Sequence, residues 1–300
     1  MVDEDPDEVG STLPRRQLGR YLREARQTAG MTLEQAADLM EWGKTTLQNL
    51  ETSKTNKVRG REVRELCEIY GVDEAKTDAL VALAKGVPAK TWYHTYGDVI
   101  PITFNLYIGL EAGAQELAIY QPILVPGLLQ TEEYARALDR LYFSNESDEQ
   151  IERRVQLRIK RQNLITRRRK PVKLRVVVQE SALRTVIGSP QVMSALLRHL
   201  VDMSTRENVD LRVLPFGAGC PCGVVLPPFV ILDFGLDRRG NIVEPTIVFS
   251  ESLTGATYFE RRAEVEAYRG AFETVHAASL APLASRDKLR DIAREFDRGR

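Results

Sequence analysis

The stretch Thr32-Leu-Glu-Gln-Ala-Ala-Asp-Leu-Met-Glu-Trp-Gly-Lys-Thr-Thr-Leu-Gln-Asn-Leu-Glu51 has the length and apolar spacing of two short helices joined by a tight turn. Thr32 and Gln35 predict a capping box, in which the threonine hydroxyl accepts from the Gln35 amide and the glutamine side chain reaches back. Ala37 is small where the helices must approach closely. The predicted shared core is Leu39, Met40, Trp42, Leu47 and Leu50.

This pattern leaves a row of polar, non-acidic side chains at the start and outer face of the second helix. Each of them can donate hydrogen bonds, and a short helix of this kind fits the major groove of DNA, where base edges are readable. A helical bundle that uses lysine and threonine only for solubility is the alternative. The capping, the core spacing and a following basic loop together favour DNA binding. The residues concerned are Lys44, Thr45, Thr46, Gln48 and Asn49.

The surrounding sequence divides the chain near residue 88. From Arg16 to Lys85 it indicates short helices and no convincing strand, with Leu18, Leu22, Ala25 and Ala29 at helical spacing and Gly30 as a stop. Gly86-Val-Pro88 breaks that pattern. We therefore predict an acidic, unstructured tail at 1–15, a helix-turn-helix domain at 16–87 and a larger α+β domain at 88–300.

Residues 16–86 resemble the five-helix DNA-binding domain of lambdoid phage repressors and bacterial xenobiotic-response-element-type regulators, which predicts an all-α N-terminal domain. The resemblance implies that Lys44, Thr45 and Asn49 meet base edges, with Thr46 and Gln48 beside them. The loop after that helix would contact the DNA backbone through Lys54, Lys57 and Arg59.

Three positions depart from that family pattern. Leu33 stands where glutamine often contacts phosphate, so Gln35 is the candidate for that contact. Glu41 occupies a turn position that is usually glycine, which predicts a mildly strained positive φ. Ser53 follows the recognition helix where glycine is usual.

Beyond residue 88 the pattern mixes helices with apolar strands. Pro126-Gly127 predicts a turn, Leu128 and Leu129 are interpreted as core anchors rather than a partner-docking loop, and Thr131 is a predicted helix cap. Helices are expected near 103–120, 131–142, 147–169, 190–203 and 260–278, and strands at 174–179, 210–214, 229–234 and 246–250.

A series of short motifs extends from Trp92-Tyr93 through Tyr120-Gln-Pro-Ile-Leu-Val-Pro-Gly-Leu-Leu-Gln-Thr131 and Val209-Asp-Leu-Arg-Val-Leu-Pro215 to Leu280-Ala-Pro-Leu-Ala-Ser285. In order and spacing this series is similar to the actinobacterial domain of unknown function 5753, over roughly 90 to 285. The resemblance implies a cytoplasmic, antitoxin-like transcription regulator, paired with a small acidic protein from a neighbouring gene. No catalytic activity comes with the family.

Charge is balanced overall, with 42 basic and 42 acidic residues, but it is segregated along the chain. Residues 88–150 carry nine acids and three bases, whereas residues 151–173 carry ten bases and one acid. We favour the interpretation that the basic run is a solvated helix paired with the acidic block, with Ile151, Val155 and Ile159 as its buried stripe. The alternative is an accessory surface for phosphate or for an acidic partner.

Nothing in the sequence argues for an enzyme or a cofactor. Cys220-Pro-Cys222 lacks the further ligands that zinc requires, Cys67 falls on an apolar helix face, and the common phosphate-binding and hydrolase motifs are missing. Asp233 and Asp237 are interpreted as a strand end and a hairpin tip. The longest apolar stretch is interrupted by Pro227 and Pro228, which argues against a membrane span, and three cysteines suit a reducing cytoplasm.

The sequence therefore predicts a sequence-specific regulator that binds a double-stranded operator as a homodimer, because one short helix reads few base pairs. Its second domain is expected to bind a small protein or an effector. Two rival hypotheses stay open: a small-molecule-sensing regulator, and a protein-interaction module with a vestigial DNA reader. A cysteine-dependent enzyme is a more distant alternative.

Overall fold

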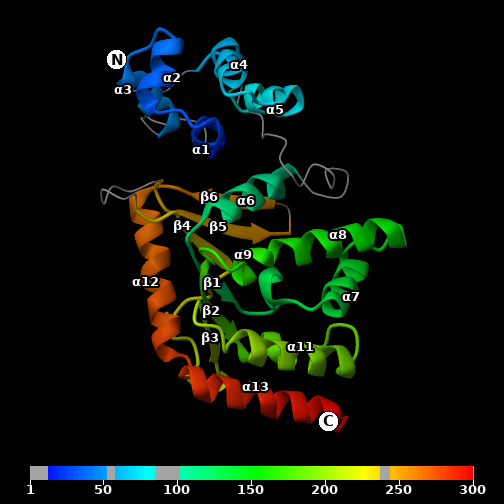
Figure 1. Ribbon diagram of the computed structural model, residues 1–300. Coiled ribbons are helices and arrows are strands. Elements are labelled where there is room, and N and C mark those ends of the chain that lie inside the picture. Colours follow the sequence, from blue (N-terminus) through cyan, green and yellow to red (C-terminus); the bar gives the residue numbers. More distant parts are fainter. Residues whose placement is uncertain (1–12, 53–57, 85–101, 237–243, 254, 300) are drawn as a thin grey trace, which may run out of the picture. The chain divides into compact units, whose positions relative to one another are not determined.

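The structure is a computed structural model that describes residues 13–52, 58–84, 102–236, 244–253 and 255–299 (Figure 1). The chain divides into two compact units, whose boundary within the described residues falls between Leu110 and Glu111. Residues 1–12 of the tail predicted at 1–15, and the predicted domain boundary near 88, lie outside the described residues. Residues 13–15, which were predicted to be unstructured, are helical.

Five helices make up the described part of the first unit before residue 85, as predicted. They are α1 (Leu13–Thr28), α2 (Leu33–Leu39), α3 (Lys44–Glu51), α4 (Gly60–Ile69) and α5 (Glu74–Ala84). Helix α1 begins at Leu13, three residues before the predicted start. Gly30 lies in the turn that follows α1, with a φ of 71°, a conformation that glycine adopts without strain.

The core of this unit is made by apolar residues from all five helices. Leu18 and Leu22 of α1, Leu47 of α3, Leu66 of α4 and Leu83 of α5 are all essentially inaccessible to solvent. Two predictions were wrong: Leu39 is 57% exposed, and Ala29, which follows α1, is exposed as well. Ala36, Ala37 and Met40 form the buried side of this part of the chain, and at about 100° per residue Leu39 lies off that side.

The second unit is built on a six-stranded mixed sheet in the order β3-β2-β1-β4-β5-β6. Strands β1, β2 and β3 run parallel, and the other three continue the sheet antiparallel to their neighbours. The strands are β1 (Glu116–Gln121), β2 (Lys173–Gln179), β3 (Val209–Leu214), β4 (Phe229–Asp233), β5 (Ile247–Ser252) and β6 (Gly255–Phe259). The predicted α+β class is confirmed.

The central strand β1 corrects the prediction of one helix over 103–120. Helix α6 (Ile102–Gly113) ends at Gly113, and three residues later the chain enters β1. Leu117, Ala118, Ile119 and Tyr120 are all buried, because β2 and β4 flank the strand and both of its faces are covered. A strand buried on both faces gives a continuous apolar run that periodicity cannot distinguish from a helix.

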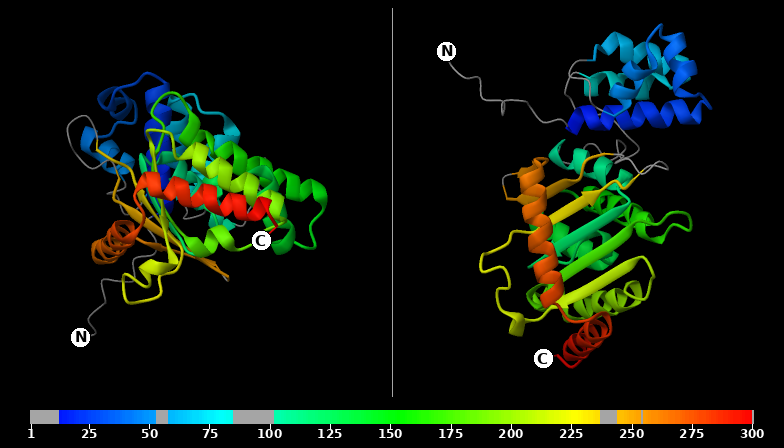
Figure 2. Two further views of the ribbon diagram at one scale, coloured as in Figure 1. Left: turned by 90° about the horizontal axis from the view of Figure 1, so that it is seen from below. Right: turned by 90° about the vertical axis from the view of Figure 1, so that its left-hand side faces the viewer.

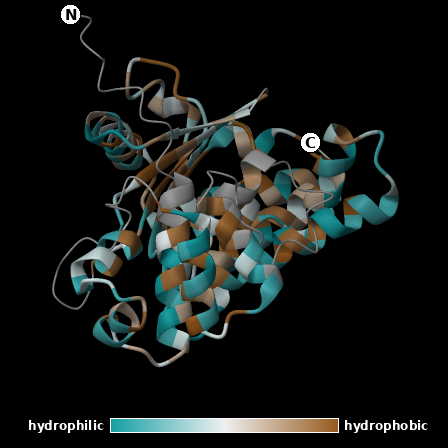
Figure 3. Cartoon of the chain, turned by 90° about the horizontal axis from the view of Figure 1, so that it is seen from above, coloured by the Kyte–Doolittle hydropathy of each residue, from teal (hydrophilic) through white to brown (hydrophobic). Residues whose placement is uncertain are grey.

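Helices cover both faces of the sheet (Figures 1 and 2). Helix α12 lies across one face and α7, α8 and α11 lie on the other, while α13 packs against α11 and β3. The helices are α7 (Glu132–Tyr142), α8 (Asp148–Arg161), α9 (Asn163–Thr166), α10 (Glu180–Arg184), α11 (Pro190–Met203), α12 (Arg262–Ala278) and α13 (Pro282–Asp297), with single 3-10 turns at Gly127–Leu129 and Phe216–Ala218. Figure 3 shows hydrophobic and hydrophilic segments alternating along the helices, as expected when one side is buried.

The connection from β1 to α7 agrees with the sequence prediction. Leu128 and Leu129 are buried core residues, and the Thr131 hydroxyl accepts from the Tyr134 amide at 3.4 Å to cap α7. The predicted long helix at 147–169 divides into α8 and α9 at Gln162. No described helix has the length and hydrophobicity that crossing a membrane requires.

Candidate nucleic-acid interface

Helix α2 begins at the predicted capping box. The Thr32 hydroxyl accepts from the Gln35 amide at 3.2 Å, and the Thr32 amide donates to Oε1 of Gln35 at 2.9 Å. Both orphan donors at this helix start are thereby satisfied. Ala36 and Ala37 are buried on the side of α2 that packs against α3, and their small size permits the close approach.

The turn between α2 and α3 is fixed by backbone geometry at Glu41. Its φ is 54°, the positive value predicted for a position at which related domains use glycine. The Trp42 amide donates to the Ala37 carbonyl at 2.8 Å, and the Gly43 carbonyl accepts from the Thr46 amide at 2.8 Å to start α3. The direction of α3 is therefore set within four residues of the end of α2.

Helix α3 presents the predicted polar side chains on its outer face. Leu47 and Leu50 are buried, and they anchor the helix to the core. Asn49 is half-buried, while the other four predicted reader residues are exposed: Lys44, Thr45, Thr46 and Gln48. One face of this short helix thus carries amide, hydroxyl and ammonium groups and no carboxylate.

Lys44 has a partner that sequence reasoning missed. Its ammonium group forms an exposed ion pair with Glu34 on the first turn of α2, and this hydrogen bond lowers the pKa of the Glu34 carboxyl. Lys44 must leave Glu34, or share its charge with it, to contact a base or a phosphate. Glu34 is therefore a negative charge beside the predicted DNA-binding surface.

A buried ion pair holds the far end of α3 against α1. The Arg26 guanidinium donates to both carboxylate oxygens of Glu51, from Nε at 2.6 Å and from NH2 at 2.8 Å, and it also donates to the Met31 carbonyl at 2.8 Å. The Arg26 and Glu51 side chains are 8% and 2% exposed. A bidentate pair of this kind fixes orientation as well as distance, so it positions α3.

The predicted backbone contacts are only partly described. Gln35 is exposed, and its side-chain oxygen accepts the hydrogen bond of the capping box. Its side-chain NH2 group is the part that could donate to a phosphate. Arg59 is exposed immediately before α4, at the end of the loop that follows α3. Lys54 and Lys57 lie outside the described residues.

Three arginines of α8 form ion pairs with the acidic block, as the favoured interpretation predicted. Arg154 pairs with Glu146 at 2.5 Å, Arg158 with Asp139 at 2.8 Å, and Arg161 with Glu111 at 2.7 Å. The Arg161 side chain is only 7% exposed, so its predicted place on a solvated face was wrong. The buried carboxylate of Glu111 provides the compensating charge that a sequence pattern does not reveal.

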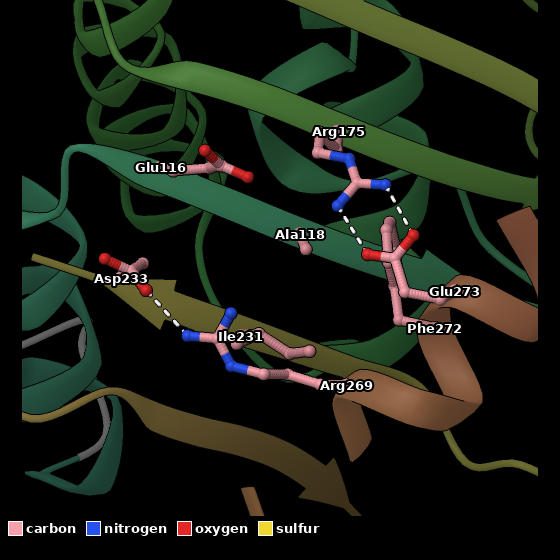
Figure 4. Close-up of a pocket in the computed structure, with 8 residues that line it drawn as sticks. All are labelled: Glu116, Ala118, Arg175, Ile231, Asp233, Arg269, Phe272 and Glu273. Atoms are coloured by element: carbon pink, nitrogen blue, oxygen red, sulfur yellow. Dashed lines mark hydrogen bonds and ion pairs between the residues drawn. The ribbon is translucent and has the colours of Figure 1, made fainter. Parts of the chain in front are cut away.

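A small polar cavity lies between α12 and the sheet (Figure 4). Both guanidinium groups that line it are already paired. Arg175 donates to the two oxygens of Glu273 at 2.7 and 2.9 Å, and Arg269 donates to Asp233 at 2.6 Å. The cavity is lined by Glu116, Ala118, Arg175, Ile231, Asp233, Arg269, Phe272 and Glu273.

Asp233 is the most highly connected carboxylate in this cavity. It ends β4, as predicted, and it accepts from the Gly235 amide at 2.9 Å and the Thr246 hydroxyl at 3.1 Å in addition to Arg269. Burial opposes its ionisation, but these donors outweigh burial and lower the pKa of Asp233. Asp237, the other carboxylate considered, lies outside the described residues.

The three cysteines are free thiols. Cys67 is fully buried in the helical core, as predicted, whereas Cys220 is exposed and Cys222 is half-buried in the loop between β3 and β4. In the described parts of the chain, no cluster of three or more metal-ligating side chains is found.

Family comparisons agree with this division of the chain. A family described as a helix-turn-helix domain matches residues 17–80, and the domain of unknown function DUF5753 matches residues 104–291. The chain belongs to the DUF5753 family. Because its N-terminal domain is a helix-turn-helix domain, this DUF5753 member is a DNA-binding transcription regulator. No curated protein and no solved structure matches it significantly.

Proposed function

We propose that this DUF5753 protein is a sequence-specific regulator in which α3 is the recognition helix. The supporting observation is the outer face of α3, where five polar side chains without an acid project from a helix held by the buried Arg26–Glu51 pair. Asn49 has the amide group that pairs with adenine, and Lys44 has the donor that pairs with guanine. The exposed threonines and Gln48 suit neighbouring bases or sugar-phosphate.

We also propose that the protein acts as a cytoplasmic homodimer on a palindromic operator. One α3 helix of eight residues reaches few base pairs, and two copies about one helical turn apart would double the sequence that is read. Selection of duplexes from a randomised library by the full chain, followed by footprinting on its own upstream region, tests this. Two protected half-sites about 10 base pairs apart are expected. Recovery of no preferred sequence would refute the proposal.

The second domain is proposed to bind a small protein partner in an antitoxin-like arrangement. The loop between β3 and β4 supports a protein partner, because Phe216, Val224 and Val225 are 62%, 61% and 94% exposed. A small acidic protein encoded next to this gene is the first candidate. The partner should co-purify with the wild type but not with a Val224→Ser/Val225→Ser variant whose thermal unfolding is unchanged. This result would support the loop as the binding surface. Equal binding by the variant would exclude it.

We propose no catalytic role and no cofactor for the chain. The remaining candidate chemistry is that of Cys220 and Cys222, and a Cys220→Ser/Cys222→Ser variant is expected to keep full DNA binding and regulation. A loss of regulation in this variant would revive a redox or metal function. An effector that shifts operator affinity and thermal stability would instead favour the small-molecule sensor.

A further inference from the structure

The basic run at 151–173 separates into two chemically different parts. In α8 the arginines at 154, 158 and 161 each form an ion pair. In the loop between α9 and β2, Arg167, Arg168, Arg169 and Lys170 are consecutive and all exposed. Among the described residues, no carboxylate lies within ion-pair distance of this loop. Local pairing therefore explains the helix but leaves the charge of the loop uncompensated.

The structure holds this basic loop in a defined shape. The Arg167 side chain donates from Nε to the Lys170 carbonyl at 2.8 Å, and Lys170 adopts a φ of 48°. The Asn208 side-chain amide donates to the carbonyls of Ile165 and Val172, at 3.1 and 2.8 Å, and so ties both ends of the loop together. The loop is thus a closed turn whose cationic residues are exposed.

Two further cations lie beside the turn. Arg206 donates to the Thr166 carbonyl at 3.4 Å, which places its guanidinium next to the start of the loop, and Lys173 is exposed at the first residue of β2. The only acid among residues 204–208 is the exposed Glu207. We define the basic loop surface as Arg167, Arg168, Arg169, Lys170, Lys173 and Arg206.

We propose that the basic loop surface is a second, sequence-independent contact for the phosphate backbone of duplex DNA. Closely spaced exposed guanidinium and ammonium groups without carboxylate partners suit a polyanion with regularly spaced charges. Duplex DNA is the favoured polyanion because the same chain carries a helix-turn-helix domain, and tethering raises the local concentration of the bound duplex around the second domain. The inference thus rests on the proposed function of α3, and it assigns the second domain a direct part in affinity.

The salt dependence of binding measures this contact. Each phosphate that a protein neutralises adds about 0.9 to the slope of log affinity against log salt concentration. Removal of two such phosphate contacts lowers the magnitude of the slope by about 1.8. When the salt concentration rises from 50 to 200 mM, the factor by which affinity falls is therefore about tenfold smaller in the variant than in the wild type. Base-specific contacts are unaffected, so the ratio of specific to non-specific affinity stays the same.

The test compares two full-length variants that lose the same charge. Arg168→Gln/Arg169→Gln removes two cations from the basic loop surface. Arg290→Gln/Arg294→Gln removes two exposed arginines from α13, where each has an acid three residues earlier. Fluorescence anisotropy on a selected operator and on a scrambled duplex, at salt concentrations from 50 to 200 mM, gives the slopes. Thermal unfolding checks that both variants are folded.

A slope reduced by one to two on both duplexes in the loop variant alone, with the operator preference kept, supports the inference. An equal slope in the loop variant, the α13 variant and the wild type overturns it. If the loop variant and the wild type have equal slopes on DNA, but the loop variant binds polyglutamate more weakly, the inference is overturned and the surface binds an acidic protein instead. If the wild type has no operator preference, the proposed function of α3 is refuted. The difference in salt slope between the wild type and the loop variant would still show whether the loop contacts phosphate.

Discussion

Replacement of Glu51 by glutamine tests whether the Arg26–Glu51 pair holds α3, the proposed recognition helix, in place. The substitution preserves shape but removes the negative charge that faces the Arg26 guanidinium at 2.6 and 2.8 Å. Both side chains are more than nine-tenths buried, so solvent cannot replace the missing partner. Removing one member of a buried ion pair typically costs about 3–5 kcal/mol. A small domain has about 5–15 kcal/mol of stability in total, so a large part of it would be lost.

Urea unfolding of the first unit measures this cost. Trp42, in the turn before α3, reports on the local packing by fluorescence, and a Trp92→Phe background removes the other tryptophan of the chain. We expect the midpoint of Glu51→Gln to fall sharply and operator binding to weaken with it. The matched control is Asp78→Asn, which breaks the exposed Arg64–Asp78 pair and should leave the midpoint almost unchanged.

The double variant Arg26→Met/Glu51→Leu separates the charge from the packing. Two apolar side chains of similar volume leave no buried charge unpaired, because the other cation near Glu51, Arg23 at 3.7 Å, has a side chain that is 25% exposed. The double variant should therefore recover most of the stability that Glu51→Gln loses. The reasoning is refuted if Glu51→Gln costs less than about 1 kcal/mol, or if the double variant is less stable than the single one.

Three further predictions concern the reader and the sheet. Glu34→Gln removes the acid beside Lys44 and should raise DNA affinity severalfold at low salt, measured by anisotropy; weaker binding would contradict the role given to Lys44. Glu41→Gly relieves a positive φ that costs about 1–2 kcal/mol, but the freer unfolded chain offsets about 0.5–1 kcal/mol of this, so urea unfolding should show a net gain of about 0–1.5 kcal/mol. Glu41→Val, in contrast, should be less stable than the wild type. The pKa of Asp233 is lowered in the folded state. The ionised Asp233 therefore contributes its full stability above the ordinary Asp pKa of about 3.9, and this contribution is lost as the pH falls through the lower pKa of the folded state. Asp233→Asn should therefore flatten the acid side of the stability profile, and an unchanged profile would show that these hydrogen bonds do not favour the ionised form.

The helix-turn-helix was predictable because its information is local. The capping box of Thr32 and Gln35 spans three residues, and the strain at Glu41 follows from one missing glycine. The core positions Leu47 and Leu50 follow from helical spacing. Each of these features depends on neighbours within one or two turns, so a single sequence contains them.

The missing parts depend on contacts between distant residues. Arg26 and Glu51 are 25 positions apart, and Arg161 and Glu111 are 50 apart, so no periodicity links the members of either pair. Both arginines resemble ordinary surface residues in the sequence. Only the folded chain, which packs α1 on α3 and brings Arg161 at the end of α8 to Glu111 in α6, turns them into buried partners.

Strand β1 failed as a prediction for a similar reason. Only two residues separate β1 from the true helix α6 before it, and the Leu and Ala of Leu117-Ala-Ile119 are good helix formers. The strand conformation is imposed by hydrogen bonding to β2 and β4, which are more than fifty and more than a hundred residues away. Tertiary pairing therefore overrides local propensity at the centre of the sheet.

The specificity ratio of the full chain tests most directly whether α3 reads bases. It is the affinity for a selected operator divided by the affinity for a scrambled duplex. We compare it between the wild type, Lys44→Ala/Asn49→Ala, and a control variant, Lys76→Ala, at an exposed position of α5. Removing each base-reading side chain should lower the ratio about tenfold or more, with binding of the double variant to the scrambled duplex largely kept. An unchanged ratio in the double variant would contradict the assignment of α3 as the recognition helix.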